Sequence, residues 1–494
     1  MKKVAVLADL LIAAVCCVSL IPSVKTQASE YSYTYTYDYF GILQESPDAY
    51  TVSEYITGAD YECGDFKDPE GMFAADDAVY IADTGNNRIV VFDITGGTLS
   101  YDRVIDGFDN NGTSDTLSGP MDIYVSEAGN MYICDTNNLR IVEMDREGKL
   151  LNLYTQPQDE TYDASQSFMP VKCVADRAGR VICQAQNINE GLMEFSPDGS
   201  FIGYIGANEV KYSMIDYIWK LISTKAQRAQ MAQFVPTEYD NLAMDSKGFI
   251  YVTTSTFDEW DLMDDQAKPI RKLNSLGDDI LIKNGRWYPI GDIDWGNAGG
   301  ISGPSKLVDI TALDNGTYYA LDKTRGRIFA YDEQGDLLYA FGGVGNTKGS
   351  FQLPAAIDHS GNELYILDSR AASVTHFTLT EYGKFINSAL SEYENGNYDA
   401  SSTYWKQVLK LNGNYDLAYI GIGRAQLRQG NYKAAMKNFK LKYDKKNYSK
   451  AFQLYRKQWI EKNLGRGVAI IIALLLISSI IKFIKKVKKE ALEA

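Results

Sequence analysis

Residues 80–93 read YIADTGNNRIVVFD, and closely similar stretches return later in the chain. They are YICDTNNLRIVEMD at 132–145 and YALDKTRGRIFAYD at 319–332, and YILD at 365–368 repeats their beginning. A unit that recurs about every 50 residues is typical of repeat architectures, in which each unit packs against its neighbours. The spacing therefore predicts one fold built from repeated units.

Each unit alternates short β-forming runs with turn residues. Residues 121–154 contain four such runs, separated by turns rich in Gly, Asn and Asp. Four short strands joined by such turns form one antiparallel blade of a β-propeller. The runs are apolar almost throughout because neighbouring blades cover both faces of each sheet.

One position marks the end of the second strand in every unit. The six occurrences are Asp83, Asp135, Gln184, Thr254, Asp322 and Asp368. We predict a mainly β, six-bladed propeller over residues 50–382, with insertions at 207–238 and 278–306 where the spacing lengthens. The sixth unit has only three runs, so we expect residues 50–56 to supply its outer strand and close the ring.

The stretch 82–89 and the linker 341–354 resemble the NHL-repeat family of six-bladed propellers. The resemblance is weaker in the third and fourth units, where Gln184 and Thr254 replace the Asp. An Asp at this place can cap its turn while an Arg holds a neighbouring strand. We interpret these residues as structural anchors, with ligand binding as the alternative: Asp83, Arg88, Asp135, Arg140, Asp322, Arg327 and Asp368.

The N-terminal 28 residues are predicted to be a signal peptide, with Lys2 and Lys3 before an apolar run and Ala28 at the cleavage site. Retention of this segment is the alternative. The Tyr-rich segment 29–49 follows, and in an extended chain its alternating tyrosines would face one way: Tyr31, Tyr33, Tyr35, Tyr37 and Tyr39. They would form either an apron packed on the propeller or a stacking surface for a glycan.

From residue 383 to 463 the pattern becomes helical. The triplet 396–398, Gly-Asn-Tyr, recurs at 430–432, and Trp405 and Phe439 share the same offset. This spacing resembles the tetratricopeptide repeat. Two such repeats are marginal alone, so we expect them to pack on the propeller. They would serve either as a spacer or as a peptide-binding groove.

The chain ends in a predicted membrane anchor. Residues 465–484 are predicted to form a transmembrane helix, with 467–484 in contact with the membrane. The basic tail 485–494 is expected in the cytoplasm, because positive charge favours that side. We therefore predict a single-pass membrane protein whose propeller and helical repeats lie outside the cell.

The net charge of −15 conceals a basic segment at 424–463, which holds twelve Lys and Arg against two Asp and Glu. This segment adjoins the predicted span, near anionic headgroups or wall polymers. No nucleic-acid motif occurs, and we expect no such partner. Cys173 and Cys183 flank a turn, and they could form a disulfide or remain buried thiols.

Loops on one face of the ring form the predicted recognition surface. Both long insertions and a loop within the fourth blade leave from the face on which the anchors lie. Helix-spaced apolar residues and an acidic loop supply the candidate binding residues: Ile218, Trp219, Ile222, Asp258, Trp260, Asp261 and Asp265. The chain enters and leaves the ring on the other face, so we expect this surface to point away from the membrane.

We expect no enzyme, because the only histidines are His359 and His376 and no nucleophile elbow, phosphate loop or zinc motif occurs. The predicted function is a membrane-anchored extracytoplasmic binding or scaffold protein for a protein or glycan, without a cofactor. The alternative is a calcium-dependent lactonase-like hydrolase, with ligands from several blades in the channel. Structural calcium on the acidic loop is a weaker prediction.

Overall fold

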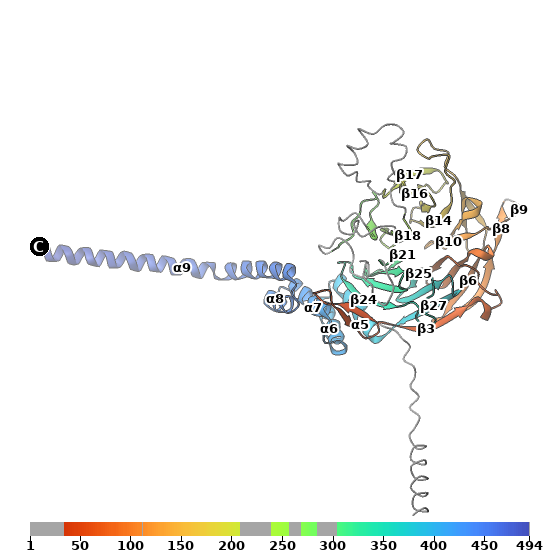
Figure 1. Ribbon diagram of the computed structural model, residues 1–494. Coiled ribbons are helices and arrows are strands. Elements are labelled where there is room, and N and C mark those ends of the chain that lie inside the picture. Colours follow the sequence, from red (N-terminus) through yellow and green to blue (C-terminus); the bar gives the residue numbers. More distant parts are fainter. Residues whose placement is uncertain (1–33, 111, 208–238, 256–267, 284–303, 494) are drawn as a thin grey trace, which may run out of the picture.

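The ring expected from the repeats is present. The computed structural model describes residues 34–110, 112–207, 239–255, 268–283 and 304–493. Six antiparallel sheets surround a central channel, and Figure 1 looks onto this ring. The mainly β, six-bladed propeller is therefore confirmed. The predicted signal segment and most of both insertions lie outside the described residues.

The first three blades each contain four strands in sequential order, with the first strand innermost. Blade 1 holds β4 (Gly71–Ala74), β5 (Ala78–Asp83), β6 (Arg88–Thr95) and β7 (Thr98–Ile105). Blade 2 holds β10 (Pro120–Val125), β11 (Met131–Asp135), β12 (Arg140–Met144) and β13 (Leu150–Tyr154). Blade 3 holds β14 (Pro170–Ala175), β15 (Val181–Ala185), β16 (Leu192–Phe195) and β17 (Phe201–Ile205). A ribbon of β8 (Gly107–Asn110) and β9 (Thr113–Thr116) lies between blades 1 and 2.

Blades 4 to 6 differ in strand number. Blade 4 has three strands among the residues described, β18 (Asn241–Met244), β19 (Ile250–Thr253) and β20 (Ile270–Leu273). Blade 5 holds β21 (Leu307–Ala312), β22 (Tyr318–Asp322), β23 (Arg327–Tyr331) and β24 (Leu337–Gly342). Blade 6 holds β25 (Pro354–Ser360), β26 (Glu363–Asp368) and β27 (Ser373–Leu379).

The continuous apolar runs follow from packing on both faces of a blade. All six residues of β5 are buried. Val79 and Ile81 join a core shared with blade 6, whereas Tyr80 and Ala82 join a core shared with blade 2. Alternate residues of a strand point to opposite faces, so a strand between two blades needs apolar side chains at every position.

The N-terminal strand closes the ring. β3 (Tyr50–Thr57) pairs antiparallel with β27, from Tyr50 opposite Leu379 to Thr57 opposite Ser373. β3 is thus the outer strand of blade 6, which confirms the expected closure. Because β3 pairs with β27, blade 6 does not expose β27 as an open sheet edge.

Buried carboxylates hold the turn after the second strand in several blades. Asp83 accepts hydrogen bonds from the Lys67 backbone N–H at 2.7 Å and from Arg88 Nε at 2.7 Å. Asp135 repeats this arrangement with the Ser118 N–H at 2.7 Å and Arg140 Nε at 2.8 Å. Each Asp therefore joins the loop that enters its own blade to the turn that follows its strand.

A hairpin from the Tyr-rich segment extends blade 5. β1 (Tyr35–Tyr37) pairs with β24 and with β2 (Leu43–Glu45). The Tyr35 ring is buried and lies 5.1 Å from the Arg327 guanidinium carbon. Tyr39 is exposed, because the strand ends at Tyr37 and the chain turns. Within the strand, Tyr35 and Tyr37 lie on the same side, with ring centroids 5.7 Å apart, and pack on the propeller, whereas Tyr39 beyond the strand does not.

A small helical domain, α5 to α8, follows blade 6. Its helices are α5 (Glu381–Glu394), α6 (Tyr398–Leu411), α7 (Asp416–Arg428) and α8 (Tyr432–Leu441). The turns after α5 and α7 each contain a Gly with φ of 79°, Gly396 and Gly430, so the same turn is built twice. α7 packs between Trp405 and Phe439, the large side chains at equivalent places of the two repeats. Two glycines of α7 allow this close approach, because a Cβ on Gly421 would clash with Trp405 and one on Gly423 with Phe439.

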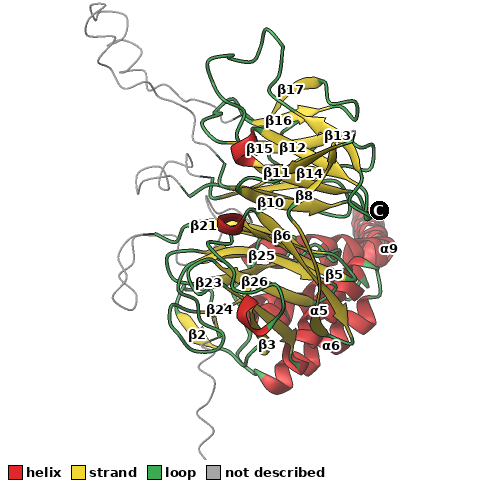
Figure 2. Ribbon diagram, turned by 90° about the vertical axis from the view of Figure 1, so that its right-hand side faces the viewer, coloured by secondary structure: helices red, strands yellow, loops and turns green. Residues whose placement is uncertain are grey.

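The helical domain and the propeller share a core. Thr380, directly after β27, caps α5 by accepting a hydrogen bond from the Gly383 N–H. Tyr415 Oη donates to the Leu338 carbonyl of β24 at 2.8 Å. One buried apolar cluster combines side chains of α5 to α7 with those of blades 5 and 6. Figure 2 shows the helices gathered on one side of the ring.

The chain ends in one continuous helix, α9 (Lys445–Glu493). An 18-residue window within it has a mean hydropathy of 2.6, and none of that window is buried. By length and composition, α9 is the one helix in the described part of the chain that could cross a membrane. Figure 1 shows it running away from the ring sideways.

Candidate functional site: a central funnel

The channel of the propeller opens into a large funnel at the face where the innermost strands end. All six blades line it, through those strands and the turns that follow them, and α5 forms part of its wall. Its cavity volume is about 1840 Å³. The six innermost strands also bring together polar side chains that are far apart in the sequence.

Polar residues in equivalent places of the inner strands form the neck of the funnel. Lys172 Nζ of β14 lies 3.0 Å from Asp122 Oδ1 of β10. The Asn241 side-chain amide of β18 donates to Asp309 of β21. Asp309 also accepts a 2.7 Å hydrogen bond from the Ile357 N–H in the next blade. These contacts connect neighbouring blades across their innermost strands.

The neck holds one ammonium group among buried carboxyl groups. Burial raises the pKa of Asp309 to about 7, against the opposing effect of Lys172. Burial also raises the pKa of Asp122. Burial alone would lower the pKa of Lys172, but Asp122 and Asp309 outweigh it and the net pKa is raised. Lys172 therefore stays protonated near neutral pH.

A hydrogen-bonded trio lies on the funnel wall between blades 5 and 6. Thr311 Oγ1 donates to Asp358 Oδ1 at 2.8 Å and lies 2.7 Å from His359 Nδ1. A hydroxyl has one proton, so His359 Nδ1 must donate to Thr311 when Thr311 donates to Asp358. Neutral His359 then keeps an acceptor lone pair on Nε2. The trio can therefore accept a proton from a bound molecule.

The wall formed by α5 carries small and charged side chains. Lys384, Ser388, Ser391 and Glu392 line the funnel. Exposed ion pairs, such as Arg177 with Glu127 at 2.7 Å, lie on the rim formed by the turns of the blades. The funnel thus offers both charges and many hydroxyl and amide groups, which suits a polar occupant.

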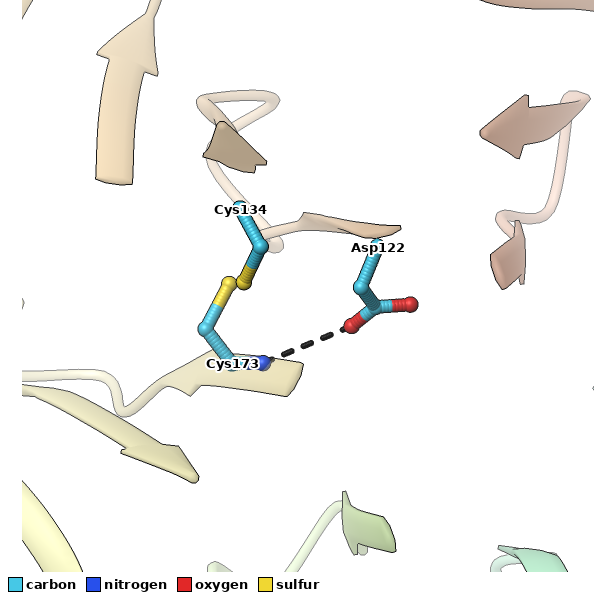
Figure 3. Close-up of side chains that lie close together, drawn as sticks. All are labelled: Asp122, Cys134 and Cys173. Carbon is cyan, nitrogen blue, oxygen red and sulfur yellow. Dashed lines mark hydrogen bonds between the residues drawn. The ribbon is translucent and has the colours of Figure 1, made fainter. Parts of the chain in front are cut away.

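The channel residues do not fit a calcium ion as they are arranged. Calcium needs six to eight oxygen ligands. Lys172 occupies the position beside Asp122, and the oxygens of Asp309 accept N–H groups from Asn241 and Ile357. A second group of possible ligands combines Asp122 of the neck with two buried cysteines, Cys134 and Cys173, with one atom of each within 4.8 Å of the others (Figure 3).

The seven predicted binding residues lie outside the described residues, so they remain predictions: Ile218, Trp219, Ile222, Asp258, Trp260, Asp261 and Asp265. Among the described residues, β18 ends at Met244 beside the turn 245–248, which lines the funnel.

Sequence reasoning missed the funnel. The signal that could have found it is a polar residue inside several of the apolar inner strands, as in Pro-Met-Asp at 120–122 and Pro-Val-Lys at 170–172. Both polar residues follow a strand-opening Pro by two positions. Leu-Val-Asp at 307–309 has the same polar position without the Pro.

Comparison with known proteins gives distant likenesses. No family model matches the sequence, and no curated protein matches it. A streptogramin B lyase is 12% identical with a TM-score of 0.39, over 68% of this chain and 100% of its own. The virginiamycin B lyase from Staphylococcus aureus is 12% identical with a TM-score of 0.38, over 67% and 100%. A putative gluconolactonase is 13% identical with a TM-score of 0.38, over 64% and 89%.

These comparisons correct the expectation that the chain is not an enzyme. That expectation rested on motifs missing from the sequence, whereas the similar structures are described as lyases and a putative gluconolactonase. Likenesses this distant assign no activity to this chain.

Proposed function

We propose that the chain is a membrane-anchored extracytoplasmic binding or scaffold protein whose funnel receives part of a protein or glycan partner. The size of the funnel carries the proposal. Sites for small molecules usually measure about 300–1,000 Å³, whereas this funnel measures about 1840 Å³. A peptide loop or an oligosaccharide fills such a volume, and the mixed polar lining suits either.

The anchor in this proposal is the C-terminal part of α9, with residues 467–484 in the bilayer and the basic tail 485–494 in the cytoplasm. The high hydropathy and full exposure of the apolar window support it. The first half of α9, from residue 445, then acts as a spacer. About 20 residues of helix at 1.5 Å each hold the ring about 30 Å from the bilayer.

The direction of α9 bears on how the partner is reached. The helix leaves beside the ring rather than along its axis (Figure 1). Neither opening of the propeller is then covered by the span. The funnel would be accessible to partners in the layer above the membrane, and the binding residues predicted between 218 and 265 remain candidates for a second contact surface.

A bulky residue in the funnel is expected to abolish partner capture. Ser388 is half-buried on the α5 wall, and Ser388→Trp would place an indole inside the funnel. We expect at least about a tenfold loss of the captured protein or glycan, equivalent to about 1.4 kcal/mol or more. The measurement is affinity purification of the full chain from detergent-solubilised membranes, followed by mass spectrometry of proteins and glycans.

Thr403→Trp is the matched control for this test. Thr403 is an exposed residue of α6 that does not line the funnel. The partner is identified as the protein or glycan that co-purifies with both the wild-type chain and the Thr403→Trp variant. Equal capture by Ser388→Trp, in protein with an unchanged melting temperature, would reject the funnel as the binding site.

The trio of Thr311, Asp358 and His359 favours a second candidate, acid–base hydrolysis or elimination in the funnel. His359 would act as the base, with Asp358 and Thr311 holding its ring. We expect any turnover of a panel of esters and lactones to fall by about 100-fold or more in His359→Ala and to be independent of added calcium. Turnover that requires calcium, or that survives His359→Ala, would contradict this candidate.

A further inference from the structure

Two thiols meet where blade 2 packs against blade 3. Cys134 lies on β11 and Cys173 on β14, and their Sγ atoms are within 4.8 Å of each other. Both side chains are buried, at 0% and 2% exposure. Figure 3 shows the two sulfur atoms side by side, with Asp122 directed to the backbone N–H of Cys173.

The thiol of Cys173 points to the neighbouring blade rather than along its own sheet. Its Sγ–H donates to the Tyr132 carbonyl of β11 at 3.6 Å. Cys183 is its register partner on β15, the pairing that the sequence left open as a disulfide. Cys183 shares this face and the same buried cluster, but the thiol of Cys173 is turned toward blade 2, where the Sγ of Cys134 lies within 4.8 Å of it.

A metal ion fits this place poorly. It would need both thiols as thiolates, and burial raises the pKa of Cys134 well above its usual range. Its third ligand, Asp122, is already paired with the Lys172 ammonium at 3.0 Å. A neutral bond between the two sulfurs requires no lasting charge in this buried site.

We propose that Cys134 and Cys173 form a disulfide that cross-links blades 2 and 3 when the chain folds in an oxidising compartment. The two thiols lose their hydrogens and an S–S bond forms between them. A small-molecule disulfide or a disulfide oxidoreductase is the oxidant: its S–S bond breaks and it leaves as two thiols. Both cysteines are inaccessible in the folded ring, so the bond forms before blade 3 closes on blade 2.

The cross-link joins blades that otherwise meet through non-covalent contacts. Thr136 Oγ1 donates to the Pro170 carbonyl at 2.6 Å, and Lys172 pairs with Asp122. The disulfide would close a loop of about 40 residues, which restricts the unfolded chain and stabilises the native ring. The cross-link rests on the proposed extracytoplasmic location, whereas the proposed binding in the funnel would stand if the thiols proved free.

Peptide mapping tests the bond directly. The protein is isolated from the membranes of cells that produce it, alkylated under denaturing conditions without reductant, and digested. We expect a linked peptide pair that contains Cys134 and Cys173, with Cys63 and Cys183 alkylated. Alkylation of Cys134 and Cys173, a link from Cys173 to Cys183, or zinc bound to the two thiols would overturn the proposal.

Melting curves of two double variants give an independent readout. We expect Cys134→Ala/Cys173→Ala to melt lower than the wild type by on the order of 5–10 °C. The matched control, Cys63→Ala/Cys183→Ala, also removes two buried thiols but keeps the bond. Reductant should lower the melting temperature of the wild type and the control only. Equal sensitivity of all three proteins to reductant would contradict the cross-link.

Discussion

A chain that begins at Gly58, and so lacks β3, is expected to lose the cooperative unfolding of the propeller. β3 is the outer strand of blade 6 and pairs with β27 along its whole length. Without it, blade 6 presents an unpaired edge, which invites association with other chains. Complete burial of a large apolar side chain contributes about 1.5–3 kcal/mol, and β3 buries Tyr50 and Ile56. The total loss is comparable with the stability of a typical domain.

The measurement is circular dichroism on heating, together with sedimentation velocity, for chains 58–494 and 47–494. The second chain removes β1 and β2 but keeps β3, so it controls for truncation itself. We expect 47–494 to melt cooperatively as a single species and 58–494 to aggregate or melt without a transition. Equal melting curves would show that β3 does not close the ring.

Tyr50 offers a milder form of the same experiment. Its ring stacks on Phe341 at 5.2 Å, and its hydroxyl lies 3.0 Å from both the Tyr319 hydroxyl and the Asn362 carbonyl. Tyr50→Ala should cost about 3–5 kcal/mol, because it leaves a cavity in the shared core. Tyr50→Phe keeps the ring and should cost about 1 kcal/mol.

The second large effect is expected when Arg424 is replaced by Met. Arg424 of α7 is mostly buried, with Nη2 2.8 Å from Asp336 and Nη1 3.6 Å from Asp332. Both carboxylates flank the turn between β23 and β24, so this guanidinium joins the helical domain to blade 5. Arg424→Met takes this guanidinium away from two buried carboxyl groups, at a cost of about 3–5 kcal/mol.

The loss should grow as the pH rises. Burial, together with repulsion from Asp336, raises the pKa of Asp332 to about 7 even with Arg424 present. When folding raises the pKa of a carboxyl group, that group favours the folded state at pH values below its pKa in the unfolded chain. This stabilisation is lost as the pH rises through the pKa of the group in the folded protein. Arg424→Met removes the opposing cation and raises the folded pKa further, so the variant should be less destabilised at pH 5 than at pH 8.

Denaturant unfolding at the two pH values, with limited proteolysis near Thr380, measures this effect. Arg177→Met is the control, because it breaks an exposed ion pair with Glu127 and should cost less than about 1 kcal/mol. Cleavage that releases the helical domain from an intact propeller is expected for Arg424→Met. A variant as stable and as protease-resistant as the control would show that Arg424 does not hold the two parts together.

The ring and its closure could be predicted because their signals are local and periodic. The motif ending at Asp83 returns at Asp135 and Asp322, and a final unit with three runs requires a strand from elsewhere. The added hairpin could not be predicted in this way. Tyr35 pairs with Ala340, and no periodicity links residues so far apart.

The funnel and the paired thiols depend on how separate blades face one another. Asp122, Lys172 and Asp309 are each the one charged residue of a largely apolar strand, and only the closed ring brings them to one channel. Cys173 and Cys183 are visible in the sequence as neighbours across a hairpin. The contact between Cys173 and Cys134 crosses two blades, so it depends on packing that the strand pattern does not encode.

Site-specific photo-cross-linking in intact membranes tests the central claim most directly. A photoreactive residue is placed at position 391 on the funnel wall of the full chain and, as a control, at position 403 on the outer surface of α6. We expect a discrete protein or glycan adduct from position 391 that position 403 does not give and that Ser388→Trp abolishes. Adducts of equal yield at both positions, or none from position 391, would contradict this claim.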